Sequence, residues 1–357
     1  MKIWIDILTP KQAMFFKPLI EKLEDKNNDL FISSRAFHET IATIKLLKIN
    51  ANIFGAYGQT SLESKLINSY DRLRLLTPNI VNFKPDIALS FSSPDCARIS
   101  FGLNTPHICV SDSPHAFHTS KLTIPLSDLL LTPWVIPYNA WTKHGINKNK
   151  IIKYHALDPI VWIKNPPSTI KPKFFDLNRK NSTILIRLPE TSASYLHEYN
   201  SKTLNQVIER IIDLNYNVIL LCRYESQFTY YKNKFKDRII IPQKFLLSKD
   251  LFSVTDLFIG LGGTMTAEAV LLGIPTISSY PGNATYVENY LIKKNFISRL
   301  HDPTKILLKI NTIFDNKLYK DKFQLQVKNF VNKMEDPVDK IIYNLENFYN
   351  TSKTTKH

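Results

Sequence analysis

The sequence predicts an α/β protein made of two doubly wound, Rossmann-like domains that face each other across a cleft. The chain has 357 residues, which is about two domains of ordinary size. Short apolar runs alternate with amphipathic segments in both halves, as in parallel sheets whose strands are joined by helices. The proline- and lysine-rich stretch 165–173 interrupts this alternation and has the composition of an inter-domain linker.

The first predicted domain, residues 1–163, begins with a strand. Thr9 and Pro10 then mark a helix start, since Thr is a favoured N-cap and Pro is tolerated at the first helical position. Apolar residues at helical spacing from Leu62 to Leu76 predict one amphipathic face of a long helix. The expected strands are Ile3–Leu8, Leu30–Ser33, Asn52–Phe54, Ile87–Phe91, His107–Val110, Leu129–Leu131 and Ile151–Tyr154, and the helices are Pro10–Glu24, Phe37–Leu47, Leu62–Phe83 and Cys96–Leu103.

After a linker over residues 164–181, the same pattern restarts in a second domain over residues 182–335. A helix over 336–350 is expected to pack back on the first domain, and 351–357 to form a frayed tail. The expected strands are Thr183–Leu188, Val218–Cys222, Ile239–Ile241, Asp256–Ile259 and Thr276–Ser278, and the helices are Leu204–Leu214, Phe228–Phe235, Lys249–Val254, Met265–Leu272, Tyr286–Lys294, Thr304–Ile313 and Lys317–Val331.

The composition is that of a soluble globular protein, with 44% hydrophobic and 22% charged residues. No uncharged apolar run reaches the roughly 18 residues that a membrane-spanning helix needs. The cysteines Cys96, Cys109 and Cys222 form no CxxC pair, which favours reduced, buried thiols and a cytoplasmic protein.

The net charge of +15 raises the question of a nucleic-acid partner. The lysines are scattered, however, and no dense basic block interleaved with aromatic residues occurs. We therefore predict no nucleic-acid partner. A diffuse positive charge is equally compatible with an anionic ligand, or with a substrate held at the inner face of an anionic membrane.

The most informative segment is the glycine cluster between the strand Asp256–Ile259 and the helix that follows it. Gly262 and Gly263 let the backbone approach a ligand, and the unpaired N–H groups of the helix start favour a phosphate. Thr264 and Thr266 are placed to cap the helix or donate a hydroxyl, and Glu268 to accept hydrogen bonds from sugar hydroxyls. The alternative is a tight turn whose glycines serve close packing alone.

Polar residues also follow other strands, at the sheet edge where doubly wound domains bind ligands. Asp95 starts a helix, where it either caps the helix or takes part in catalysis. Asp112 and His115 lie in one loop with His118, and either is a candidate general base; a metal site there lacks an evident fourth ligand. Arg187 ends a strand and suits a diphosphate, because its guanidinium pairs two oxygens at once.

Several segments together resemble a largely archaeal family of unknown function, domain of unknown function 354. They are the opening Lys2–Pro10, Lys84-Pro85-Asp86, the loop Asp112–Ala116 and the run from Arg187 to His197. That family more distantly resembles the GT-B enzymes, including UDP-N-acetylglucosamine 2-epimerases and the glycosyltransferase that makes lipid II. Their shared mark, a Gly-Gly turn with Glu-Ala and then Gly-x-Pro, stands here at Gly262–Ala269 and Gly273–Pro275.

The resemblance implies a GT-B glycosyltransferase that binds a nucleotide sugar, UDP-linked, as substrate and needs no other cofactor and no metal. It implies that Gly262, Gly263 and Thr264 hold the diphosphate and that Glu268 contacts the ribose. The epimerases' His-Arg-Arg-Glu-Asn run is replaced here by Arg187-Leu188-Pro189-Glu190, which argues against 2-epimerisation. An epimerase or hydrolase, with Asp95, Asp112 and Glu190 as acid and base groups, and a non-catalytic nucleotide-binding protein are the alternatives.

Overall fold

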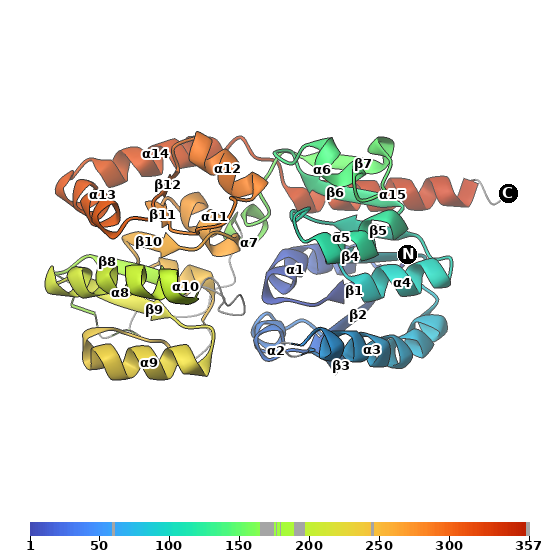
Figure 1. Ribbon diagram of the computed structural model, residues 1–357. Helices are drawn as coiled ribbons and strands as arrows, with labels where there is room; N and C mark the ends of the chain where they lie inside the picture. The colour runs from blue at the N-terminus through green and yellow to red at the C-terminus, as the bar shows by residue number, and fades with distance from the viewer. Residues whose placement is uncertain are drawn as a thin grey trace. The chain divides into compact units, whose positions relative to one another are not determined.

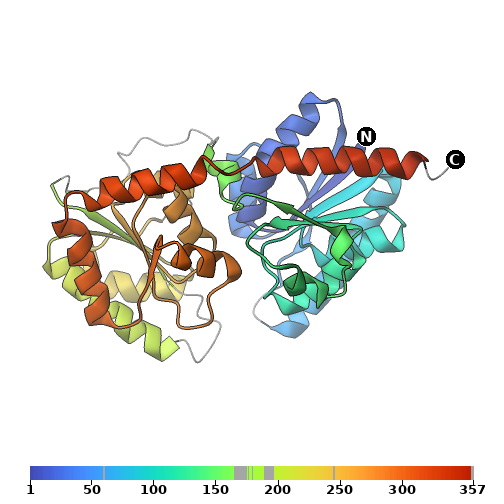
Figure 2. The same ribbon diagram turned by 90° about the horizontal axis from the view of Figure 1, so that it is seen from above.

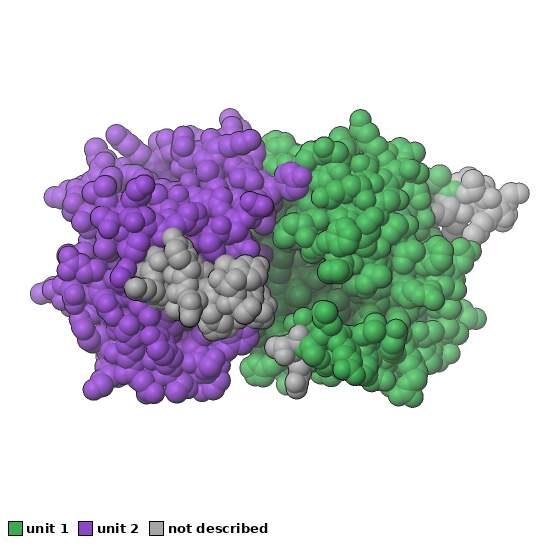
Figure 3. Space-filling model, viewed as in Figure 1, with its two compact units in different colours: residues 1–165, 334–357 green, residues 166–333 purple. Residues whose placement is uncertain are grey.

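The computed structural model describes residues 1–58, 61–164, 175, 177–178, 180–188, 197–243 and 246–354. It confirms the predicted α/β architecture. The chain divides into two compact units, one formed by Met1–Asn165 with Met334–His357 and the other by Pro166–Lys333 (Figure 3). Most of the expected linker lies outside the described residues, as does Glu190.

Unit 1 is built on a parallel seven-stranded sheet with the strand order β3-β2-β1-β4-β5-β6-β7 (Figures 1 and 2). The order reverses between β1 and β4, and ligands of doubly wound sheets bind outside the carboxyl ends of strands at such a point. β1 is almost wholly buried, as a central parallel strand must be. The strands are β1 (Lys2–Ile7), β2 (Asp29–Ala36), β3 (Asn52–Ala56), β4 (Ile87–Phe91), β5 (His107–Val110), β6 (Leu129–Pro133) and β7 (Ile151–Tyr154).

The helices of unit 1 cover both faces of this sheet (Figure 2). α1 contacts α2, α7 and α15, whereas α4 contacts α3 and α5. Thr9 caps α1 as predicted, because its side chain accepts a hydrogen bond from the N–H of Gln12. The helices are α1 (Pro10–Asp25), α2 (His38–Leu46), α3 (Leu62–Phe83), α4 (Pro94–Gly102), α5 (Phe117–Thr123), α6 (Tyr138–Thr142), α7 (Ile160–Lys164) and α15 (Pro337–Thr354), with 3₁₀ turns at Ile124–Leu126 and Lys148–Lys150.

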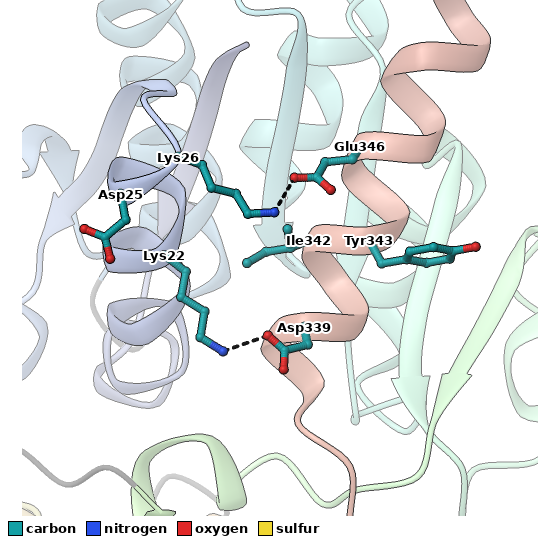
Figure 4. A pocket seen from close by; sticks show the side chains of 7 residues that line it. All are labelled: Lys22, Asp25, Lys26, Asp339, Ile342, Tyr343 and Glu346. Carbon is teal, nitrogen blue, oxygen red and sulfur yellow. Dashed lines mark hydrogen bonds and ion pairs between the residues drawn. The ribbon is translucent and has the colours of Figure 1, made fainter.

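The last helix, α15, lies along α1 and runs to Thr354, beyond the expected end at residue 350. Val338, Ile341, Ile342 and Leu345 recur at helical spacing and are buried. Lys22 of α1 and Lys26, which caps its C-terminus, form ion pairs with Asp339 and Glu346 of α15 beside a pocket (Figure 4). Because exposed ion pairs contribute little, we attribute the attachment of α15 to its apolar face and its alignment to the charges.

Unit 2 contains a parallel five-stranded sheet with the order β12-β11-β10-β8-β9. The prediction of a strand over Ile239–Ile241 is wrong, because Ile240 forms only an isolated bridge, to Ile219 of β9. The strands are β8 (Thr183–Arg187), β9 (Asn217–Leu221), β10 (Leu257–Gly260), β11 (Thr276–Ser278) and β12 (Ile297–Arg299); the helices are α8 (His197–Asp213), α9 (Glu225–Phe235), α10 (Ser248–Phe252), α11 (Thr264–Leu271), α12 (Tyr286–Lys293), α13 (Pro303–Asp315) and α14 (Tyr319–Val331), with a 3₁₀ turn at Lys236–Arg238.

Several short elements escaped the sequence patterns, among them α5, α6, α7 and β12. Each has three to seven residues, too few to establish a period. A second difference concerns α3, whose expected apolar face is only partly buried. Leu76 is fully buried and Leu73 partly, whereas Leu62, Leu66 and Tyr70 are exposed. No helix in the described ranges is long and apolar enough to cross a bilayer.

One buried histidine makes the stability of unit 1 depend on pH. The ring nitrogens of His107 lie 2.9 Å from Ser90 Oγ and 3.1 Å from Ser127 Oγ, and burial lowers its pKa to about 4. The unfolded chain, with an ordinary histidine pKa, takes up a proton first as the pH falls.

We therefore expect the free energy of unfolding to fall by about 3 kcal/mol between pH 6.5 and 4 because of His107 alone. Urea unfolding of the wild type and of His107→Gln at several pH values measures this share. Equal pH slopes for the two proteins would show that His107 is not its source.

Candidate functional site

Charged side chains from three separate elements meet at the carboxyl edge of the unit 1 sheet. Lys11, in the first turn of α1, places its Nζ 2.6 Å from Asp112 Oδ2 and 2.8 Å from Asp158 Oδ2. Tyr154, the last residue of β7, donates its hydroxyl to Asp158 Oδ1 at 2.5 Å. We call these four residues the Lys11 cluster. Asp158 is buried, whereas the Lys11 and Asp112 side chains keep 18% and 20% exposure and so remain accessible to a ligand.

The two carboxylates of the Lys11 cluster differ in their acidity. Burial tends to raise the pKa of Asp112, but the charge and hydrogen bond of Lys11 and a hydrogen bond from Ser113 outweigh it and lower that pKa. Burial raises the pKa of Asp158 to about 6, against the opposing charge of Lys11. Two carboxyl groups whose pKa values are pushed apart are suited to separate base and acid roles.

His115 lies in the same loop as Asp112, and its side chain is exposed. Partial desolvation lowers the pKa of His115, while the negative charge of Asp112 opposes that shift. A hydrogen bond to buried His144 holds this loop in place, since the ring Nε2 of His144 lies 2.9 Å from the carbonyl oxygen of Pro114. His118 points to solvent, with its ring edge-on to that of Phe117. Asp112 and His115 are therefore both available on the accessible side of the loop.

Asp95 is held in a different and deeper arrangement, which we call the Arg72 network. The Arg72 guanidinium lies 2.5 Å from Asp6 Oδ1 and 2.9 Å from Asp95 Oδ2, and its side chain is 1% exposed. Ser93, which caps α4, donates to Asp6 at 2.6 Å, and Ser69 donates to Asp95 at 2.7 Å. Asp95 is thus neither the cap of α4 nor an open carboxylate.

In unit 2 the glycine turn, Gly260–Thr264, joins β10 to α11. Gly262 and Gly263 have φ values of +76° and +81°, the left-handed region that glycine adopts without strain. Among the described residues, a Cβ added to Gly263 would meet no atom within 4 Å, so no described side chain covers the turn at this point. Gly263 is the N-cap of α11, and no described side chain caps the first N–H groups of this helix, an arrangement in which helix starts can bind anions.

The polar residues of α11 are less open than their spacing implied. Thr264 is half-buried at the helix start. Thr266 is 1% exposed, and its hydroxyl, for which the described residues offer no hydrogen-bond partner, faces Gly260. Glu268 is also 1% exposed and accepts a hydrogen bond from Ser248 of α10 at 2.9 Å.

Arg187 stands at the end of β8, beside the glycine turn. Ile186 of β8 pairs with Ile259 of β10, so Arg187 and Gly260 leave neighbouring strands at the same edge of the sheet. Its charge acts on Cys222, after β9, where burial raises the pKa of the thiol to about 11 and Arg187 opposes this shift. The structure thus brings Arg187, Gly262, Gly263 and Thr264 to one edge, at the switch point of the unit 2 sheet.

Sequence reasoning missed five residues that form buried or partly buried polar contacts, namely Lys11, Asp158, Tyr154, Arg72 and Glu288. Glu288 of α12 is buried, accepts a hydrogen bond from Ser278 at 2.5 Å, and places Oε2 where a Cβ on Gly262 would lie within 2.9 Å of it. Lys11 had a signal, since it lies in the first turn after the first strand. Within the described ranges, no three His, Cys, Asp or Glu side chains are grouped to hold a metal ion.

Two doubly wound units define the GT-B fold, and solved structures of that fold are similar to this chain. The UDP-GlcNAc 2-epimerase from Neisseria meningitidis, bound to UDP-GlcNAc, has a TM-score of 0.75 at 17% identity, covering 97% of this chain and 99% of that one. The spinosyn rhamnosyltransferase SpnG has a TM-score of 0.62 at 15% identity, covering 97% and 100%.

The chain belongs to the family described as "Protein of unknown function (DUF354)", which matches residues 1–351. Among curated proteins, the uncharacterized protein MJ0665 of Methanocaldococcus jannaschii is 29% identical over 344 residues, 94% of this chain and 95% of that protein. The family resemblance inferred from the sequence is therefore confirmed.

The Arg72 network makes a stability prediction. Arg72→Met would leave two buried carboxylates unpaired, so we expect the free energy of unfolding to fall by about 3–5 kcal/mol. Neutralising the carboxylates as well, in Arg72→Met/Asp6→Asn/Asp95→Asn, should recover part of that loss. Urea unfolding followed by circular dichroism measures both.

The matched control is Arg98→Met, because Arg98 is an exposed arginine on the neighbouring helix α4. Its effect should stay within about 0.5 kcal/mol. A loss of that small size for Arg72→Met would mean that the buried ion pairs do not stabilise unit 1.

Proposed function

We propose that this protein is a GT-B glycosyltransferase that takes a UDP-linked sugar as its donor. The observation that carries the proposal is the start of α11 at the switch point of the unit 2 sheet, which has no side-chain cap and where Gly263 faces no atom of the described residues within 4 Å. Such a helix end binds a diphosphate through its N–H groups and its dipole. The neighbours of known activity support the choice, since one is a rhamnosyltransferase and another is bound to UDP-GlcNAc.

In this proposal unit 2 stabilises the leaving group. When the sugar C1–O bond breaks, its electron pair passes to the diphosphate, and the α11 N–H groups meet that charge with fixed dipoles. Arg187 adds a guanidinium beside the turn, as the pairing of β8 with β10 implies. No metal is required to neutralise the leaving group. Glu268, buried next to Ser248, takes the ribose hydroxyls.

Unit 1 supplies the base. Asp112, ionised and partly accessible, removes the proton from the acceptor hydroxyl, whose oxygen then forms the new bond to C1. Lys11 holds Asp112 in place, and His115 is the second candidate for the same role. We assign no proton transfer to Asp95, because it is paired with Arg72; its role is to position the start of α4. The acceptor we propose is one presented at a membrane surface, which suits the net charge of +15.

A 2-epimerase is the second candidate, because the Neisseria epimerase has a higher TM-score than the rhamnosyltransferase, 0.75 against 0.62. In an epimerase, Asp112, whose pKa is lowered, would act as the base, and Asp158, whose pKa is raised to about 6, would act as the acid. Against it stands the sequence after β8, where Arg187-Leu188 begins a run unlike that of the epimerases. The two candidates differ in one respect: an epimerase changes the sugar nucleotide without any acceptor.

Calorimetric titration with UDP, UDP-N-acetylglucosamine and GDP, with NMR spectra of each mixture over hours, tests the proposal. We expect a uridine nucleotide to bind and its sugar to stay intact until an acceptor-containing lipid extract is added. Conversion of the sugar without acceptor would support the epimerase. Binding of none of the three would contradict the assignment of the glycine turn.

The same titration tests Glu268. In Glu268→Ala, UDP binding should weaken by about 1–3 kcal/mol, the loss expected when a buried hydrogen-bonding group is removed. Ser248→Ala is the control, because it removes only the hydroxyl that donates to Glu268 and should retain most of the affinity. Unchanged affinity in Glu268→Ala would take this residue out of the site.

Asp112 is tested by turnover. Asp112→Asn should lower kcat by about 10²–10⁴-fold, the usual contribution of a general base, and leave the Kd for UDP unchanged. Asp25→Asn, an exposed carboxylate on α1, is the matched control and should keep the full rate. A full rate in Asp112→Asn would transfer the base role to His115.

A further inference from the structure

α3 exposes an apolar surface in its N-terminal half. Leu62, Leu66, Ile67 and Tyr70 are exposed by 84%, 54%, 50% and 60%. The helix is attached to the sheet by other residues, chiefly Arg72, Leu76 and Ile80. Single exposed apolar residues are ordinary, but four within nine positions of one helix form a patch of the kind that marks an interaction site.

The outermost stripe of this patch has a symmetric pattern. Glu63, Ile67, Tyr70 and Arg74 follow one another at spacings of four, three and four residues, which places them along one line of the helix. The line has an acid at one end, a base at the other and two apolar side chains between them. In the described part of the chain, Glu63 and Arg74 are exposed and make no ion pair with any neighbour.

We propose that this surface of α3 binds the same surface of a second copy of the chain, with the two helices antiparallel about a two-fold axis between Asn68 and Ser69. A two-fold interface uses one patch twice, so the patch must be complementary to itself. An antiparallel pair sets Glu63 opposite Arg74 of the second copy, at both ends. In the middle, Ile67 meets Tyr70 of the second copy.

Charge favours a second copy over a membrane as the occupant. The exposed charges of α3 from Glu63 to Arg74 are two acidic and two basic, the others being Lys65 and Asp71, and they sum to zero. The whole chain carries +15, so this neutral surface is a place where two copies can approach without repulsion. A surface that docks on anionic lipids would instead be bordered by an excess of lysine and arginine.

Sedimentation velocity of the full chain between about 1 and 100 µM tests the proposal. We expect the wild type to reach twice its 41.3 kDa mass. Ile67→Glu should keep the circular dichroism spectrum and shift the protein to monomer, because it buries a charge at the centre of the interface. Leu308→Glu, at a residue 67% exposed on α13, is the matched control and should leave the dimer unchanged.

Charge reversal tests the pairing itself. Glu63→Lys and Arg74→Glu should each raise the dimer Kd about tenfold, since each sets like charges opposite one another. The double variant Glu63→Lys/Arg74→Glu restores opposite charges at both ends only in the antiparallel arrangement, so its Kd should return towards that of the wild type.

Three results would overturn the proposal: a wild type that stays monomeric at about 100 µM, a dimer that Ile67→Glu leaves intact, and a double variant no tighter than the single ones. Co-sedimentation of monomeric protein with anionic lipid vesicles, lost in Ile67→Glu, would assign the patch to a membrane instead. These readouts measure mass and not turnover, so they stand apart from any failure of the proposed glycosyltransferase activity.

Discussion

The ion pairs of Arg72 with Asp6 and Asp95 are the constraint around which unit 1 is arranged. They join α3, β1 and the start of α4 in the interior, where an unpaired charge would be costly. Hydroxyls stabilise the Asp6 carboxylate further: Ser33 and Ser93 both donate to Asp6, and Trp4 donates to Ser33. The network thus holds β1 to α3 and to the start of α4, which follows the loop after β4.

The candidate site groups of the two units differ in kind. In unit 1 they are side chains already paired with one another, since the Lys11 ammonium lies between the carboxylates of Asp112 and Asp158. Such a cluster keeps its geometry before any substrate arrives, which suits the base role that we propose for Asp112. Unit 2 offers backbone instead, because Gly263 leaves the first N–H groups of α11 without a side-chain cap. Backbone dipoles do not titrate, and they suit a group whose charge changes during a reaction.

The elements that local pattern predicted are those with a strong period or a strong stop signal. Thr9-Pro10 before α1 and the glycine turn before α11 mark their helices without any knowledge of the fold. The hydrophobic pattern predicted less well whether a strand pairs and whether a helix face is buried, because tertiary contacts decide both. Ile239–Ile241 has the composition of a strand, yet only Ile240 bridges β9. Leu62, Leu66 and Tyr70 have the spacing of a core face, yet the sheet covers only the later turns of α3. Spacing shows which side chains share a face, but not whether anything covers that face.

By itself the sequence determined the fold class, the family and the glycine turn between β10 and α11, because these depend on residues close together in the chain. The backbone of that turn has positive φ angles at positions 262 and 263, which glycine adopts without strain. Only the tertiary structure brought Lys11 to Asp112 and Asp158, across 101 and 147 positions, and Arg72 to Asp6 across 66. A charged side chain has no local signature for its partner; the pair forms because the sheet order sets β1 beside β4 and brings the ends of β5 and β7 to the same edge. That is why Asp95 looked like a helix cap in the sequence and is an ion-paired group in the fold.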